Sequence, residues 1–181
     1  MPSLNRPLAC AWMTALTLLA GRGVAAPEDG MPVSGFDIQR YQGRWYEIAR
    51  LENRVERGLT AVSADYSRNP DGSIRIVNRG YDPASGSWRV TVNHACFDGS
   101  PSVASLRVTL LGPLYIGYRV VALDPDYRWA VVMGPSRGYL WLLARDKRPD
   151  DSVKRAFLAK ARALQSDIGG LVWVEQQRDD N

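Results

Sequence analysis

The stretch GRWYEIAR, residues 43–50, constrains the fold of this chain more than any other segment. The two-residue period of a strand divides its side chains between two faces, with Trp45, Glu47 and Ala49 on one and Tyr46, Ile48 and Arg50 on the other. Both faces therefore carry groups that need a partner other than bulk water. An antiparallel sheet with a single core leaves one face mostly polar. Two occupied faces instead predict a sheet curled around an interior, with a second element packed outside.

Seven further segments of alternating apolar and polar residues follow, separated by turn residues such as those of 69–72, which read NPDG. These segments are residues 60–67, 73–81, 87–97, 103–111, 118–123, 128–133 and 139–145. Eight is the number of strands at which the interior of a barrel can just hold one small ligand. The sequence therefore predicts an all-β fold, an eight-stranded antiparallel up-and-down barrel.

Near the C-terminus the apolar period becomes helical. Residues 150–168 carry apolar side chains at helical spacing, and the glycines of 169–170 end the run. We expect a C-terminal α-helix over 150–168 that packs outside the barrel, on outward apolar groups such as Tyr46 and Ile48. Residues 171–176 are expected to form a short extra strand at the edge of the barrel.

The N-terminal residues 1–26 form a separate unit. A basic Arg6, an apolar run over 8–20 and small residues over 23–26 are typical of a secretory signal peptide. The run is shorter than the roughly 20 residues that a bilayer-spanning helix needs. We therefore expect cleavage of residues 1–26 and export of the protein. The apolar run follows Cys10 instead of preceding it, which is the wrong order for acylation, so a lipid anchor at this cysteine is not expected.

The rest of the chain is expected to comprise a flexible lead-in over 27–35, the barrel with its helix over 36–177 and a tail over 178–181. The formal net charge is +4, but arginine is spread along every segment. This spread indicates a solvated surface, so no nucleic-acid partner is expected. Without residues 1–26 the chain has one cysteine, Cys96, and one histidine, so neither an internal disulfide nor a metal site is expected.

Three separated pieces of the chain together resemble the signature of the lipocalin family. They are Gly43 with Trp45 at the start of the first long strand, Asp126-Tyr127 in a late turn, and Arg145 at the end of the last main strand. Alternating strand direction brings all three pieces to one end of the barrel, the closed end. There Arg145 is expected to cover the ring of Trp45 as a cation–π pair. These residues are expected to be structural.

Other segments resemble one branch of that family, the bacterial outer-membrane lipocalins and their plant and animal apolipoprotein D relatives. The resemblance is carried by residues 45–50, 54–59, 112–113, 122–124 and 139–141. It implies a non-catalytic carrier of fatty acids or lysophospholipids, in the periplasm or at the outer membrane of a Gram-negative bacterium. Those bacterial proteins are usually acylated, and this chain departs from them there. No cofactor is expected, and the protein is expected to be a monomer or a homodimer.

The alternation of the strands predicts a mostly apolar interior with a few polar groups, which suits an acyl chain whose head group lies near the mouth. The residues expected to bind the ligand are Glu47, Tyr66, Asn78, Leu106, Val108, Tyr118, Val120, Tyr139 and Trp141. The same alternation places Ala49 and Ala122 on the inner face. Glu47 and Asn78 have an alternative role, an internal hydrogen bond that only satisfies the barrel.

An enzymatic alternative depends on Cys96. A few lipocalins isomerise lipid peroxides with a thiol inside the barrel, which here requires Cys96 to face inward with a lowered pKa. The sequence leaves the facing of Cys96 and of His94 open. Haem or pigment binding, known in other lipocalins, is a third reading. Independently, the apolar connection Leu114-Tyr115-Ile116 at the open rim either contacts a membrane surface or a partner, or folds over the mouth of the cavity.

Overall fold

The computed structural model describes residues 30–111 and 114–179 of the chain. The expected signal peptide, residues 1–26, lies outside the described residues, as do residues 27–29 of the expected lead-in, residues 112–113 and residues 180–181 of the expected tail. The barrel and the C-terminal helix fall within the described ranges.

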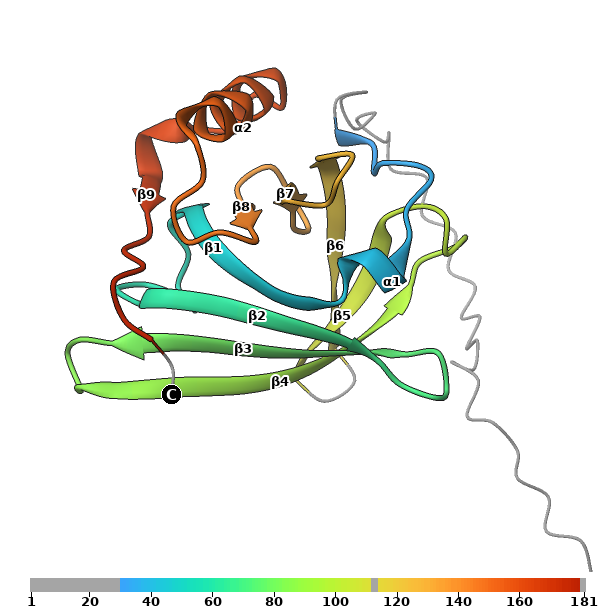
Figure 1. Ribbon diagram of the computed structural model, residues 1–181, viewed down its shortest axis with the longest axis horizontal. Coiled ribbons are helices and arrows are strands. Elements are labelled where there is room, and N and C mark those ends of the chain that lie inside the picture. The colour runs from blue at the N-terminus through green and yellow to red at the C-terminus, as the bar shows by residue number, and fades with distance from the viewer. Residues whose placement is uncertain (1–29, 112–113, 180–181) are drawn as a thin grey trace, which may run out of the picture.

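Nine strands form a single sheet, and the first eight close into an antiparallel barrel (Figure 1). Each strand from β1 to β7 pairs with the next in sequence, and β8 pairs with β1 to close the barrel. The strands are β1 Gly43–Leu51, β2 Thr60–Arg68, β3 Ile74–Asp82, β4 Ser87–Phe97, β5 Ser105–Leu111, β6 Leu114–Leu123, β7 Trp129–Met133, β8 Leu140–Ala144 and β9 Leu171–Trp173. The predicted eight-stranded up-and-down barrel with a short extra strand is confirmed.

Strand direction defines the two ends of the barrel. A short helix, α1 (Ile38–Tyr41), precedes β1 and lies at the closed end, together with the turn between β6 and β7 (Figure 1). β1 runs from there to the open end. The open end is bordered by loop 52–59 between β1 and β2 and by turn 134–139 between β7 and β8.

A register shift in β1 changes which of its residues face inward. The shift falls between Glu47 and Ala49 in the pairing with β8. After it, Ala49 packs in the core outside the barrel, whereas Arg50 pairs with Trp141 and forms an ion pair with the inward-facing Glu47. One extra residue in a strand reverses the facing of the residues that follow. The predictions that Ala49 faces inward and Arg50 outward are therefore wrong.

β6 also departs from the prediction in two ways. It starts at Leu114 rather than at Tyr118, so the apolar connection is part of the strand. Leu114 and Tyr115 are exposed at the rim, but Ile116 packs against the inner core, which corrects its assignment to the exposed rim. A second register shift, just before Ala122, places this residue in the outer core, so its predicted inward facing is wrong as well.

The sheet has an apolar core on each face, as the two occupied faces of β1 predict. The inner core lies inside the barrel and comprises Phe36, Ile38, Tyr41, Trp45, Ala64, Tyr66, Ile74, Ile76, Ala95, Ala104, Leu106, Val108, Val120, Tyr127, Ala130, Val132 and Leu143. The outer core comprises Ile48, Ala49, Leu51, Val121, Val131, Met133, Leu140, Leu142, Ala144, Phe157, Ala161 and Leu164. The last three belong to the C-terminal helix and the residue that ends it.

This helix, α2 (Asp151–Ala163), lies outside the barrel on the same side as β9 (Figure 1). Its buried residues pack against Ile48 and the partly buried Tyr46, so the predicted docking surface is confirmed. The helix ends earlier than the predicted residue 168. Gln165 adopts φ +54°, a left-handed conformation that does not continue an α-helix, and the short 3-10 helix η2 (Ile168–Gly170) follows.

The C-terminal segment completes the closure of the barrel. One edge of β1 pairs first with β2, over Gly43 to Tyr46, and then with β9, over Ala49 to Leu51. At the change of partner, the side-chain amide of Gln176 donates to the backbone oxygens of Glu47 (2.8 Å) and Val62 (2.9 Å). Gln176 therefore joins β1 to β2 where their own pairing has ended.

Candidate ligand-binding site

The closed end of the interior is built on Trp45 and Arg145. Trp45 is fully buried and its Nε1 donates to the backbone oxygen of Tyr41 (2.8 Å). Arg145 lies over the indole, with its Cζ 3.9 Å from the ring centroid, which confirms the predicted cation–π pair. Its guanidinium also donates to the backbone oxygens of Arg44 (2.7 Å) and Gln42 (2.8 Å). One side chain thus covers the indole and holds the chain entering β1.

The other expected signature residues lie around this pair, with one exception. Gly43, the first residue of β1, has φ +89°, a conformation that favours glycine, and a Cβ at this position would lie 3.4 Å from Nη1 of Arg145. The hydroxyl of Tyr127 accepts from the backbone N–H of Asp37 (2.8 Å), which fixes the start of α1. Asp126 lies in the turn at the closed end, but its side chain is exposed and faces Arg128 (3.9 Å). The turn is instead held by Asp124, whose carboxylate accepts from the backbone of Asp126 (3.0 Å).

Three tyrosine hydroxyls meet inside the barrel above Trp45. The Tyr118 hydroxyl lies 2.7 Å from that of Tyr41 and 2.9 Å from that of Tyr66. Burial raises the pKa of each phenol above its usual range, so all three remain neutral. Tyr66 and Tyr118 were expected in the site, but Tyr41 was missed because it precedes the first strand.

A buried ion pair lies in the same interior, nearer the open end. Arg50 is only 1% exposed, and its Nη1 donates to Oε1 of the buried Glu47 (2.9 Å). Its Nη2 donates to the backbone oxygen of Glu56 in loop 52–59 (2.7 Å). Arg50 was not among the residues expected in the site, because no residue type marks the register shift that turns it inward. The sequence does offer one signal for an inward Arg50: it is a charged residue in a strand whose two faces both need partners.

Loop 52–59 is fastened across this end by the Glu56 carboxylate. Its Oε2 accepts from Nε1 of Trp141 on β8 (2.9 Å) and from the side chain of Asn53. Asn53 in turn accepts from the backbone N–H of Glu56 (3.0 Å). The Glu56 side chain therefore ties the loop to β8. Trp141 packs against the inner core, so it faces inward as predicted.

The remaining expected ligand-binding residues divide into three groups. Leu106, Val108 and Val120 belong to the inner core, so they form apolar lining. Asn78 donates to the side chain of Asn93 (2.9 Å), which fits its alternative role as an internally satisfied group. Tyr139 lies before β8 and is 43% exposed at the rim, rather than in the interior as predicted, because β8 begins one residue later.

The comparison with known proteins identifies the family. Residues 36–176 match the family model of a lipocalin-like domain. The chain belongs to the lipocalin family. It is 43% identical over 170 residues to the outer membrane lipoprotein Blc of Escherichia coli (strain K12), an alignment that spans 94% of this chain and 96% of the relative. It is 38% identical over 122 residues to apolipoprotein D of Rattus norvegicus, 61% of each chain.

Solved structures agree on the architecture. The crystal structure of Per a 4, a major cockroach allergen, superposes with a TM-score of 0.64 at 17% identity, over 81% of this chain and 92% of that one. At this identity the match shows the lipocalin fold alone. Membership of the family implies that the barrel binds a small hydrophobic ligand, and relatives named as outer membrane lipoproteins support an exported location in the cell envelope.

Cys96 and His94 lie on the outer face of this lipocalin barrel. Their neighbour Ala95 is fully buried in the inner core, and in β4 successive side chains point to opposite faces. Cys96 accordingly lies opposite Arg107 of β5, on the outside. The enzymatic alternative required an inward thiol, which this register does not provide.

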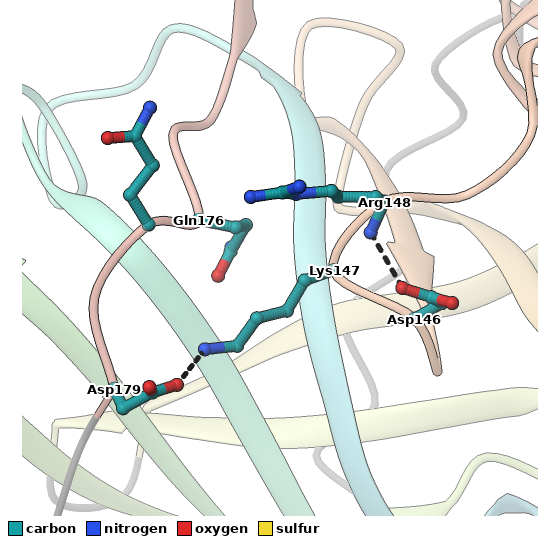
Figure 2. A pocket seen from close by; sticks show the side chains of 6 residues that line it. Asp146, Lys147, Arg148, Gln176 and Asp179 are labelled. Carbon is teal, nitrogen blue, oxygen red and sulfur yellow. Dashed lines mark hydrogen bonds and ion pairs between the residues drawn. The ribbon is translucent and has the colours of Figure 1, made fainter.

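A hollow on the outside of the barrel is too polar for an acyl chain. Figure 2 shows it between the segment after β8 and the C-terminal segment, where Lys147 forms an ion pair with Asp179 (2.5 Å). The side chains around this hollow are all charged or amide groups: Asp146, Lys147, Arg148, Gln176, Gln177 and Asp179.

Over residues 30–111 and 114–179, no group of three or more His, Cys, Asp or Glu side chains is placed to hold a metal ion. In the same ranges, no helix has the length and apolar character needed to cross a bilayer.

The protonation of Glu47 follows from its surroundings. Burial raises the pKa of the Glu47 carboxyl well above its usual range, and the nearby Glu56 carboxylate raises it further, whereas Arg50 lowers it. In the unfolded chain this carboxyl titrates near 4.5. A folded pKa above the unfolded pKa gives stability that is fully present below pH 4.5 and is lost as the pH rises through the folded pKa.

We therefore expect Glu47→Gln to flatten the pH profile of stability. Between about pH 5 and about pH 8, wild type loses about 1.4 kcal/mol for each unit by which the folded pKa exceeds the unfolded one, while glutamine cannot ionise. Urea denaturation at a series of pH values measures this difference. Glu52→Gln, at an exposed position in loop 52–59, is the control and should follow wild type. Parallel profiles for wild type and Glu47→Gln would contradict the assignment.

Proposed function

We propose that this lipocalin binds a single-chain lipid, a fatty acid or a lysophospholipid, inside its barrel and carries it within the bacterial cell envelope. The observation that supports this most directly is the division of the interior along the barrel. Apolar side chains such as Leu106, Val108 and Val120 line it, and the charged groups Glu47 and Arg50 lie toward the open end. A single-chain lipid is divided in the same way, with an apolar acyl chain and a polar head group at one end.

The energetics suit reversible transport. Burying ten methylene groups contributes about 8 kcal/mol at ~0.8 kcal/mol each, before the cost of association. A net binding free energy of about 8 kcal/mol corresponds to a dissociation constant of about 1 μM, so after the cost of association we expect micromolar or weaker affinity. Such an affinity holds a lipid through an aqueous compartment and still permits its release.

Lipid exchange is proposed to take place at the rim formed by β5 and β6. Leu114 is 62% exposed and Tyr115 is 51% exposed at the start of β6, at the open end. Two adjacent exposed apolar side chains at the mouth suit a brief contact with a membrane surface. The relatives named as outer membrane lipoproteins favour the envelope as the place of this contact.

A displacement titration tests the proposed binding. The neutral fluorescent probe N-phenyl-1-naphthylamine is bound to the mature protein and titrated with lauric acid or lauroyl lysophosphatidylcholine. We expect both lipids to displace the probe, and failure of every acyl ligand to compete would contradict the proposal.

We expect Val108→Trp to weaken lipid binding at least about tenfold, because an indole at an inner position occupies the volume of the acyl chain. Val92→Trp is the matched control, since Val92 is exposed on the outer face of β4, and it should bind lipid as wild type does. Circular dichroism verifies that both variants fold. Equal affinities for the two folded variants would place the lipid outside the barrel.

A further inference from the structure

Arg50 is the least expected group in the interior. It is a cation with almost no exposure, and the carboxylate that faces it belongs to Glu47, a group whose own burial favours the neutral form. Its contact with Glu47 is a single hydrogen bond rather than the two parallel bonds that a guanidinium and a carboxylate can form. The ion pair therefore leaves much of the donor capacity of Arg50 unused.

The remaining contacts of Arg50 use part of that capacity but leave its Nε without an acceptor in the described part of the chain. Its Nη2 donates to two backbone oxygens of loop 52–59, those of Glu56 (2.7 Å) and Leu59 (3.3 Å). Its Nε is buried and has no hydrogen-bond partner among the residues that the structure describes. A buried guanidinium N–H without an acceptor is costly, and native proteins usually supply one.

The position of Arg50 suggests what the acceptor is. Arg50 and Trp141 are paired across β1 and β8, with the inner core on one side and loop 52–59 on the other. A lipid whose chain lies among the inner-core residues has its head group at this level. The loop that borders the site is held by Glu56, Trp141 and Arg50 through a few hydrogen bonds that can re-form after a ligand has entered.

We propose that Arg50 is the head-group anchor of this barrel and binds the anionic oxygens, carboxylate or phosphate, of a single-chain lipid. The inference rests on the proposed carrier function and adds a ligand class to it, lipids with a negatively charged head. Burial favours protonation of Glu47, and the protonated carboxyl can donate a second hydrogen bond to the same anion. Neutral lipids of equal chain length lack the charge that would compensate the guanidinium, so they bind more weakly.

The test compares charged and neutral lipids of one chain length by displacement of N-phenyl-1-naphthylamine. One arm pairs lauric acid with dodecanol, and the other pairs lauroyl lysophosphatidic acid with monolauroylglycerol. We expect wild type to prefer the anionic member at least about tenfold, the ratio that one charge-assisted hydrogen bond supports. A preference in only one arm identifies carboxylate or phosphate as the natural head group.

Two variants assign the preference to Arg50. Arg50→Gln should reduce it to about onefold, whereas Arg75→Gln, the same change at an exposed position of β3, should retain it. Equal affinity of wild type for both members in both arms would overturn the anchor and leave the carrier function standing. Retention of the preference by Arg50→Gln would also overturn it. Failure of all four lipids to bind would instead contradict the carrier function itself.

A measurement on wild type keeps the test decisive if Arg50→Gln does not fold. Carbon-13 NMR of lauric acid labelled at its carboxyl carbon reports the ionisation of the bound head group as the pH is lowered. A guanidinium in contact favours the charged form, so the bound acid should titrate below the free acid. A bound carboxyl that titrates at or above the free acid would overturn the assignment.

Discussion

Replacing Trp45 with alanine is expected to lower the free energy of unfolding by about 3–5 kcal/mol, the range for removing a large aromatic side chain from a core. The indole is fully buried, donates to the Tyr41 backbone and lies under the Arg145 guanidinium. The substitution therefore leaves a cavity and removes the ring that Arg145 covers. Urea denaturation followed by far-ultraviolet circular dichroism measures the change.

Trp173→Ala is the matched control for this prediction. Trp173 is 45% exposed on the short strand β9, so the same substitution removes less buried area. We expect a clearly smaller loss of stability. Similar losses for Trp45→Ala and Trp173→Ala would contradict the central structural role of the closed end.

Phe157→Ala is expected to have an effect of similar size, about 3–5 kcal/mol, for a different reason. Phe157 is fully buried between α2 and the outer face of the barrel, where it packs in one cluster with Ile48 and Leu142. Its loss removes the main apolar contact that holds α2 against the sheet. Hydrogen exchange should show faster exchange across α2 than across β1, and chemical denaturation gives the total loss.

Arg155→Ala is the control on the same helix, because Arg155 is exposed and points away from the outer core. Its stability and exchange rates should remain close to those of wild type. If Phe157→Ala behaved in the same way, α2 would not be held by its apolar face.

The architecture was predictable because it depends on repeated local patterns. Alternating segments and the turn residues between them give the number of strands, and a hairpin meander fixes which strands are neighbours. The contact between Arg145 and Trp45 followed from the family signature together with strand direction, although the two residues lie far apart in the chain. The change to helical period gave α2 and its outward-facing partners Tyr46 and Ile48.

The interior was less predictable because facing depends on register. The register shift before Ala49 reverses the facing of the residues at the end of β1. It brings Arg50 rather than Ala49 into the barrel. A shift in β6 does the same to Ala122. No residue type marks either position. The charged cluster therefore became visible only when the strand pairing was known.

Side-chain partners brought in from loops were the second gap. Glu56 reaches Trp141, 85 positions later in the chain, from a segment whose charged composition indicates only a loop. Tyr41 joins Tyr66 and Tyr118 from a short helix ahead of the barrel. The family signature predicted a structural role for Asp126, but the carboxylate of Asp124 holds this turn. Contacts of this kind depend on chain geometry that period and composition do not encode.

Native mass spectrometry of the protein isolated from its own cell envelope, recorded before and after incubation with lauric acid and lauroyl lysophosphatidylcholine, tests the carrier function most directly. We expect a mass increase that corresponds to one single-chain lipid per barrel, present on isolation or acquired on incubation, and absent from folded Val108→Trp. A protein whose mass stays that of the bare chain under all of these conditions would contradict the account.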